Sequence, residues 1–146
     1  MNKAEILKSV HDKLSEKAVY LEKLIDETRA ANNETKSSMG DKYETSREMV
    51  QQEINNLQVQ LSDVLKQLES LRTISDKPSQ KVERGALIQT LKGFFYISVS
   101  AGEIVLDGKK IFIISPESPL AQAMKGLAQN QSFVLNGKQN LIENIW

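Results

Sequence analysis

Hydrophobic residues in the stretch 50–71 recur with a strict seven-residue period. Successive members are separated alternately by four and three positions, in the series Val50, Ile54, Leu57, Leu61, Val64, Leu68 and Leu71. This pattern is typical of a coiled-coil helix, whose narrow apolar stripe must pack against a partner helix. The stretch 50–71 therefore predicts one long helix with a single buried face.

A looser stripe precedes it. The same seven-residue frame accommodates Leu7, Val10, Leu14, Leu21, Leu24 and Ala31. Lys17 interrupts this stripe and Thr28 is a weak member. The stretch predicts a second helix with a less regular apolar face, and His11 lies on a mixed face of it, where we expect a surface residue rather than a ligand.

The segment 32–45 between the two stripes is rich in Asn, Ser, Thr and Gly. A polar break centred between two apolar stripes favours an antiparallel helical hairpin. Each arm of about 30 residues would be roughly 45 Å long at 1.5 Å per residue. A parallel homodimer through the same stripes is the alternative.

Beyond residue 84 the pattern changes to short β-branched and aromatic runs at 85–91 and 94–99. Two further strand pairs surround Asp107-Gly108 and Asn136-Gly137, and Asp-Gly and Asn-Gly are the strongest short signals for a β-hairpin. These runs predict a small antiparallel sheet.

One short helix is predicted after the first of these hairpins. Ser118 suits the N-cap, Pro119 the first helical position and Gly126 the C-terminal end. The fold class is thus α+β, with an N-terminal antiparallel coiled-coil hairpin at 1–76 and a β-sheet domain with one short helix at 85–146. The polar segment 77–84, which contains Pro78, is predicted to be the linker.

Composition narrows the functional classes. The 146 residues contain no cysteine, one histidine, and 19 basic and 19 acidic residues. This excludes a disulfide scaffold and a cysteine nucleophile, and it argues against a wholesale basic nucleic-acid binder. No apolar run approaches the roughly 20 residues of a membrane span, so we expect a cytoplasmic protein without a membrane partner.

Candidate chemistry lies at the predicted tip of the hairpin, near 40–45. Asp41 and Glu44 are three positions apart, which places both carboxylates on one face if the second helix starts there. Such a pair could share a Mg²⁺ ion, weakly unless other groups completed the coordination shell. The same spacing is that of a capping box, in which both acids serve the helix terminus alone.

The whole chain resembles the bacterial Gre-type transcript cleavage factors. The stretch ISPESPLAQAMKG at 114–126 resembles their strand followed by Ser-Pro-Leu and a short helix ending in Gly, and 132–146 resembles their terminal hairpin. In GDKYET, Gly40, Asp41 and Glu44 keep the spacing of the family's tip motif Gly-Asp-Leu-Ser-Glu-Asn. The resemblance implies an FKBP-like fold for the globular domain.

It also implies a function. Family members bind RNA polymerase, insert the hairpin into its secondary channel and stimulate Mg²⁺-dependent cleavage at the 3′ end of backtracked RNA. By this resemblance Asp41 and Glu44 are the metal-assisting acids, sharing Mg²⁺ with the polymerase active site. Glu117, Ser118 and Pro119 match the loop that contacts polymerase. The chain itself would be a monomeric cofactor protein, not an enzyme, and would bind no metal tightly alone.

Three alternatives stay open. Lys42, Tyr43 and Thr45 depart from the family's tip, and a lysine beside the acids lowers the local negative potential. The chain could therefore be a Gre-like regulator that docks in the channel without promoting cleavage. An FKBP-like folding helper would need aromatic residues beyond those of the core. A coiled-coil adaptor without a site would need only the helices.

Overall fold

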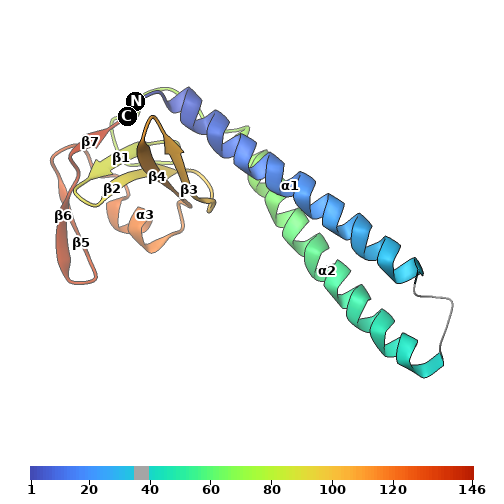
Figure 1. Ribbon diagram of the computed structural model, residues 1–146. Coiled ribbons are helices and arrows are strands. Elements are labelled where there is room, and N and C mark those ends of the chain that lie inside the picture. Colours follow the sequence, from blue (N-terminus) through green and yellow to red (C-terminus); the bar gives the residue numbers. More distant parts are fainter. Residues whose placement is uncertain (35–39) are drawn as a thin grey trace. The chain divides into compact units, whose positions relative to one another are not determined.

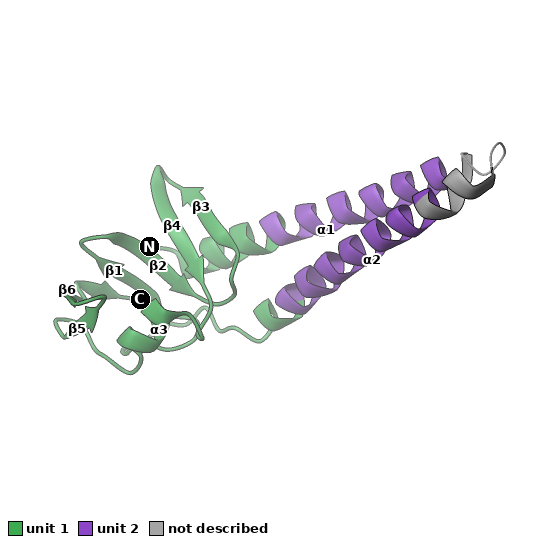
Figure 2. Cartoon of the chain, turned by 90° about the horizontal axis from the view of Figure 1, so that it is seen from below, with its two compact units in different colours: residues 1–12, 69–146 green, residues 13–68 purple. Residues whose placement is uncertain are grey.

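The computed structural model describes the backbone of residues 1–34 and 40–146, with side chains described outside 33–45. Helix α1 spans Lys3–Glu34 and helix α2 spans Gly40–Leu71. The chain forms two compact units, coloured differently in Figure 2. We call residues 13–68 the hairpin unit and residues 1–12 with 69–146 the sheet unit. No described helix contains a stretch long and apolar enough to cross a membrane.

The hairpin unit consists of two helices that run side by side in both views (Figures 1 and 2). The apolar stripe predicted along α2 is confirmed in its register. Ile54, Leu57 and Val64 are buried, and Val50 and Leu61 in the same stripe are half-buried. A heptad stripe this regular leaves one face to bury, and the predicted helical hairpin is confirmed.

The stripe along α1 follows a different path from the predicted one. Its buried apolar residues are Ile6, Val10, Leu14, Ala18, Leu21 and Ile25. The successive spacings are four, four, four, three and four, so the stripe passes through Ala18 and leaves Lys17 exposed. An extra four-residue step locally unwinds a coiled coil. Because of this extra four-residue step, Ala18 rather than Lys17 occupies the buried position, and the stripe is not interrupted by a charged residue.

Seven strands and one short helix follow. The strands are β1 (Leu87–Thr90), β2 (Gly93–Ile97), β3 (Gly102–Leu106), β4 (Lys109–Ile114), β5 (Ser132–Leu135), β6 (Lys138–Leu141) and β7 (Asn144–Ile145), and the helix is α3 (Pro119–Met124). One sheet has the order β3-β4-β2-β1-β7, while β5 and β6 form a separate two-stranded sheet. The predicted hairpin followed by a small sheet domain with one short helix is therefore confirmed.

Both predicted turn dipeptides connect adjacent strands. Asp107 and Gly108 have φ values of 52° and 74°, and Asn136 and Gly137 have φ values of 53° and 75°. Positive φ at both central residues is the requirement of a type I′ hairpin turn. Every strand pair is antiparallel except β2 with β4, which pair in parallel because β3 occupies the sheet edge beyond β4.

Helix α3 and the β5–β6 hairpin cover one face of the larger sheet. The buried core there consists of Val82, Ala86, Ile88, Ile97, Ala121, Met124, Phe133 and Ile142. Val82 lies in the segment 77–84, and its N–H donates to the Leu127 carbonyl at 2.7 Å while its carbonyl accepts from Gly126 at 2.9 Å. The end of that segment thus belongs to the domain, and the boundary of the linker stays a prediction.

Candidate functional site

The loop between β4 and α3 carries the three residues predicted to dock on a partner. Its shape is set by Ser115, whose hydroxyl donates to the Glu117 carboxylate at 2.6 Å and accepts from the Glu117 N–H at 3.0 Å. The Ser115 carbonyl accepts from the Ser118 N–H at 3.0 Å. One serine therefore organises the loop through both its side chain and its main chain.

Helix α3 starts where the sequence predicts. Ser118 has extended backbone angles, and its side chain accepts a hydrogen bond from the Ala121 N–H at 3.2 Å. Pro119, which has no N–H to lose, occupies the first turn and is exposed. Gly126 follows the helix with φ of 78°, the left-handed conformation that glycine adopts most readily. The N-cap and first-turn predictions are confirmed.

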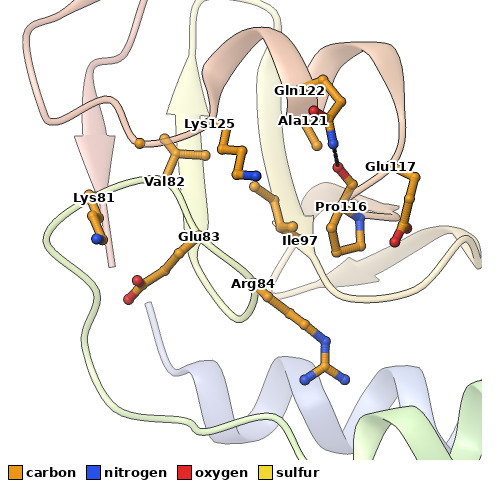
Figure 3. Close-up of a pocket in the computed structure, with 11 residues that line it drawn as sticks. Lys81, Val82, Glu83, Arg84, Ile97, Pro116, Glu117, Ala121, Gln122 and Lys125 are labelled. Atoms are coloured by element: carbon orange, nitrogen blue, oxygen red, sulfur yellow. Dashed lines mark hydrogen bonds between the residues drawn. The ribbon is translucent and has the colours of Figure 1, made fainter.

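A hollow of about 370 Å³ lies beside this loop in the sheet unit. Its apolar lining comes from Val82, Ile97 and Ala121. Figure 3 shows Ile97 and Lys125 in the middle of the hollow, with Pro116 and Glu117 on one side. The Gln122 side chain donates to the Pro116 carbonyl at 2.8 Å, which ties the helix to the loop.

Charged side chains of both signs surround the hollow. Lys81, Arg84 and Lys125 are basic, and Glu83 and Glu117 are acidic. The hydrogen bond from Ser115 lowers the pKa of Glu117, and its own main-chain N–H and the charge of Arg84 act in the same direction. Glu117 thus offers a stable negative charge at the exposed edge of the loop.

Arg84 was not singled out by the sequence. Its Nη2 donates to the Ser70 carbonyl at 2.6 Å, to the Ser70 hydroxyl at 2.8 Å and to the Thr73 hydroxyl at 2.9 Å. The guanidinium therefore satisfies groups at the C-terminal end of α2, where carbonyls lack intrahelical partners. Its long separation from Ser70 along the chain carries no periodic signal, so only the fold could identify this role.

The two tip acids, Asp41 and Glu44, have side chains outside the described residues. Their assignment as metal-assisting acids stays a prediction from spacing and resemblance. Among the described residues, no group of three or more His, Cys, Asp or Glu side chains could hold a metal ion. The structure places Glu117, Ser118 and Pro119 together on one loop and says nothing of the tip.

When the chain is compared with known proteins, it matches solved structures but no family model and no curated protein. A structure of the transcription factor Gfh1 is similar over 92% of both chains, with 16% identity and a TM-score of 0.39.

Two further structures of Gfh1 are similar to the chain. GreA factor homolog 1 (Gfh1) of Thermus thermophilus is similar over 93% of this chain and 94% of that one, with 14% identity and a TM-score of 0.35. Thermus aquaticus Gfh1 is similar over 94% of each chain, with 17% identity and a TM-score of 0.33. The chain is thus similar along nearly its whole length to structures of Gre-factor homologues, at low sequence identity.

Proposed function

We propose that this chain is a Gre-type transcription factor that binds bacterial RNA polymerase in the cytoplasm. The observation that carries the proposal is the loop at 115–119, where the residues that resemble the family's contact motif stand at the exposed start of α3. Glu117 and Pro119 are exposed there, beside a hollow with an apolar lining. The exposed carboxylate of Glu117 and the apolar ring of Pro119, next to such a hollow, are suited to binding another protein.

The loop is also preorganised for binding. Ser115 holds the Glu117 carboxylate and Ser118 holds the first turn of α3, so little conformational freedom would be lost on docking. Pro119 adds rigidity because its ring restricts the backbone before binding. Docking through a preformed loop favours affinity without requiring a large interface.

The hairpin would then carry chemistry into the polymerase. Asp41 and Glu44 would hold a Mg²⁺ ion shared with the polymerase active site, near the 3′ end of the nascent RNA. A second metal ion in such a site supplies an activated water for cleavage. The chain contributes two carboxylates and delivers them, whereas the nuclease activity belongs to the polymerase.

Amide variants at the tip separate this chemistry from helix capping. Asp41→Asn keeps a good N-cap and Glu44→Gln keeps the hydrogen bond of a capping box, while both remove the charge that Mg²⁺ needs. We expect the free energy of unfolding of the double variant to lie within about 1 kcal/mol of that of the parent. The variant should bind polymerase normally but should no longer stimulate cleavage of backtracked RNA. Full cleavage activity in the variant would overturn the catalytic assignment.

A proline substitution tests docking. Pro119→Ala should weaken binding to core RNA polymerase severalfold and leave the fold intact, because the first helical turn tolerates alanine. Pro78→Ala is the matched control, since Pro78 is also exposed but lies outside the loop. Unchanged affinity of the Pro119 variant would remove this loop from the interface.

A second function is favoured by Lys42, which stands between the two tip acids in the sequence. Its positive charge would weaken metal capture, and the chain would then occupy the channel without promoting cleavage. The parent protein distinguishes the two functions in one assay. Polymerase binding with cleavage supports the first, and binding with inhibition of cleavage supports the second.

A further inference from the structure

One end of the larger sheet gathers residues that the proposed docking does not use. Strands β2 and β4 are parallel and in register, with Phe94 opposite Ile111, so both strands begin at this end. The turn after β1, at Leu91 and Lys92, and the turn after β3, at Asp107, lie there too. Leu91 is 90% exposed at this turn.

Two aromatic rings and a lysine form a row on one sheet face that runs from this end toward Trp146, which lies beside Leu87 at the start of β1. The Lys109 ammonium lies 5.4 Å from the ring centroid of Phe94. The ring of Phe94 in turn lies 6.3 Å from that of Trp146, at an interplanar angle of 40°. Both rings are half-buried and Lys109 is exposed, so the row is accessible from solvent.

The main chain of Trp146, at the far end of the row, is held in place. The Trp146 N–H donates to the Leu87 carbonyl at 2.9 Å, and the Leu87 N–H donates to the Trp146 carbonyl at 3.1 Å. The buried ammonium of Lys3 also donates to the Trp146 carbonyl, at 3.1 Å. Three hydrogen bonds thus hold the main chain of Trp146, so this main chain loses little freedom when a ligand stacks on the ring.

The charge on this row differs from that of a similar pair on the opposite face. There, Lys110 lies 6.0 Å from the Phe112 ring, and the carboxylate of Glu103 lies 3.7 Å from the Lys110 ammonium. Within the described part of the chain, no carboxylate forms an ion pair with Lys109. Residues 77–146 hold eight basic and five acidic residues, so this part of the chain carries a net positive charge.

We propose that the row formed by Lys109, Phe94 and Trp146 binds single-stranded nucleic acid. Unpaired bases stack on aromatic side chains, and a neighbouring lysine neutralises the phosphate between them. Duplexes keep their base faces inside the helix, so a flat row of rings selects single strands. Lys109 lies at the start of β4 and Phe94 at the start of β2, whereas the docking loop follows the end of β4, so this proposal stands without the docking proposal.

The test uses the full chain and no polymerase. A fluorescently labelled, unstructured single-stranded RNA of roughly 12 nucleotides is titrated with the protein at low salt. We expect saturable binding by anisotropy and quenching of indole fluorescence, because Trp146 is the only tryptophan. The quenching places the ligand on the row, which binding alone would not do.

Two variants and a control test the row itself. Phe94→Leu keeps an apolar side chain and removes the stacking face, so RNA affinity should fall about tenfold. Lys109→Ala should reduce the slope of log affinity against log salt by about 0.7. Lys138→Ala removes another exposed lysine, from β6, and should leave the quenching of Trp146 unchanged.

Several outcomes would overturn the proposal. Unchanged Trp146 fluorescence on RNA binding, or equal affinity of the folded Phe94→Leu variant, would remove the row from any RNA site. Equal affinity for a duplex of the same length would show that the attraction is electrostatic only. Single-stranded DNA serves as a further probe, and weaker DNA binding would narrow the ligand to RNA.

Discussion

The two compact units are stabilised in different ways. The hairpin unit depends on one narrow stripe, in which Leu14, Leu21 and Ile54 are at most 3% exposed. The sheet unit has a broader core and also buries polar anchors. The Lys3 ammonium, for example, donates to the Lys77 carbonyl at 2.6 Å, and burial lowers the pKa of this amine. The comparison teaches that the hairpin unit can unfold locally along its stripe, whereas the sheet unit, with its broad core and buried hydrogen bonds, should unfold cooperatively.

The largest expected effect is on the core of the sheet unit. Met124 is fully buried beneath the larger sheet, so Met124→Ala should lower the free energy of unfolding by about 2–5 kcal/mol. Chemical denaturation followed by tryptophan fluorescence measures this change. Met49→Ala is the control, because Met49 is 67% exposed on α2. Similar losses in both variants would show that burial does not distinguish the two sites.

A smaller and more local effect is expected in the hairpin unit. Leu21→Ala removes a buried member of the stripe and should lower local stability by about 2 kcal/mol. Amide hydrogen exchange should accelerate along residues 13–32 and 46–68 and stay unchanged in the β-strands. The control is Val19→Ala, which trims an exposed side chain of the same helix. Equal acceleration in the strands would mean that the two units open together.

Tyr96 offers a change of opposite sign. Its side chain is fully buried, and its hydroxyl has no hydrogen-bond partner among the described residues. Tyr96→Phe removes the unpaired group and should raise the free energy of unfolding by about 1 kcal/mol at neutral pH. An unchanged or lower stability in this variant would contradict the expectation.

The same tyrosine predicts a pH dependence. Burial raises the pKa of Tyr96 to about 12, so the unfolded chain loses this proton first, near pH 10. The parent should therefore lose stability as pH rises from about 10 to 12, by about 2 kcal/mol. The phenylalanine variant should lack this contribution. Parallel alkaline curves for the two proteins would exclude Tyr96 as their cause.

The smallest effect tests the path of the stripe along α1. A strict heptad frame would bury Lys17, whereas the structure leaves it exposed and buries Ala18. Lys17→Ala should therefore change the free energy of unfolding by less than about 0.5 kcal/mol. Ala18→Asp provides the contrast, since it would place a charge within the stripe. A large gain from Lys17→Ala would restore the heptad frame.

Sequence reasoning succeeded where one local rule dominated. The period from Val50 to Leu71 leaves one possible buried face, and Asn136-Gly137 leaves few turn types. It failed at Ala18, because alanine carries too weak an apolar signal to compete with a regular frame. It also missed the parallel pairing of β2 with β4. These strands are separated in the sequence by β3, and the hydrophobic pattern of a strand does not indicate which other strand it pairs with.

The candidate site shows the same limit. Ser118 and Pro119 could be placed from capping rules alone, because the helix start depends on adjacent residues. Arg84 and Gln122 could not, because their partners lie elsewhere in the fold or are main-chain carbonyls. A hydrogen bond to a main-chain carbonyl does not depend on the side chain of the accepting residue. The residue types at Pro116 and Ser70 therefore give no sign of these hydrogen bonds.

The position of β7 has a consequence for the order of folding. This strand pairs with β1, joining Ile88 to Ile145 across most of the domain sequence. During synthesis the stripe residues of 13–68 are complete long before β7 leaves the ribosome, and helical contacts between near neighbours form quickly. The larger sheet, by contrast, stays one strand short until residues 144 and 145 are available. The hairpin unit should therefore emerge as a folded rod while its sheet domain is still an open, slowly closing intermediate.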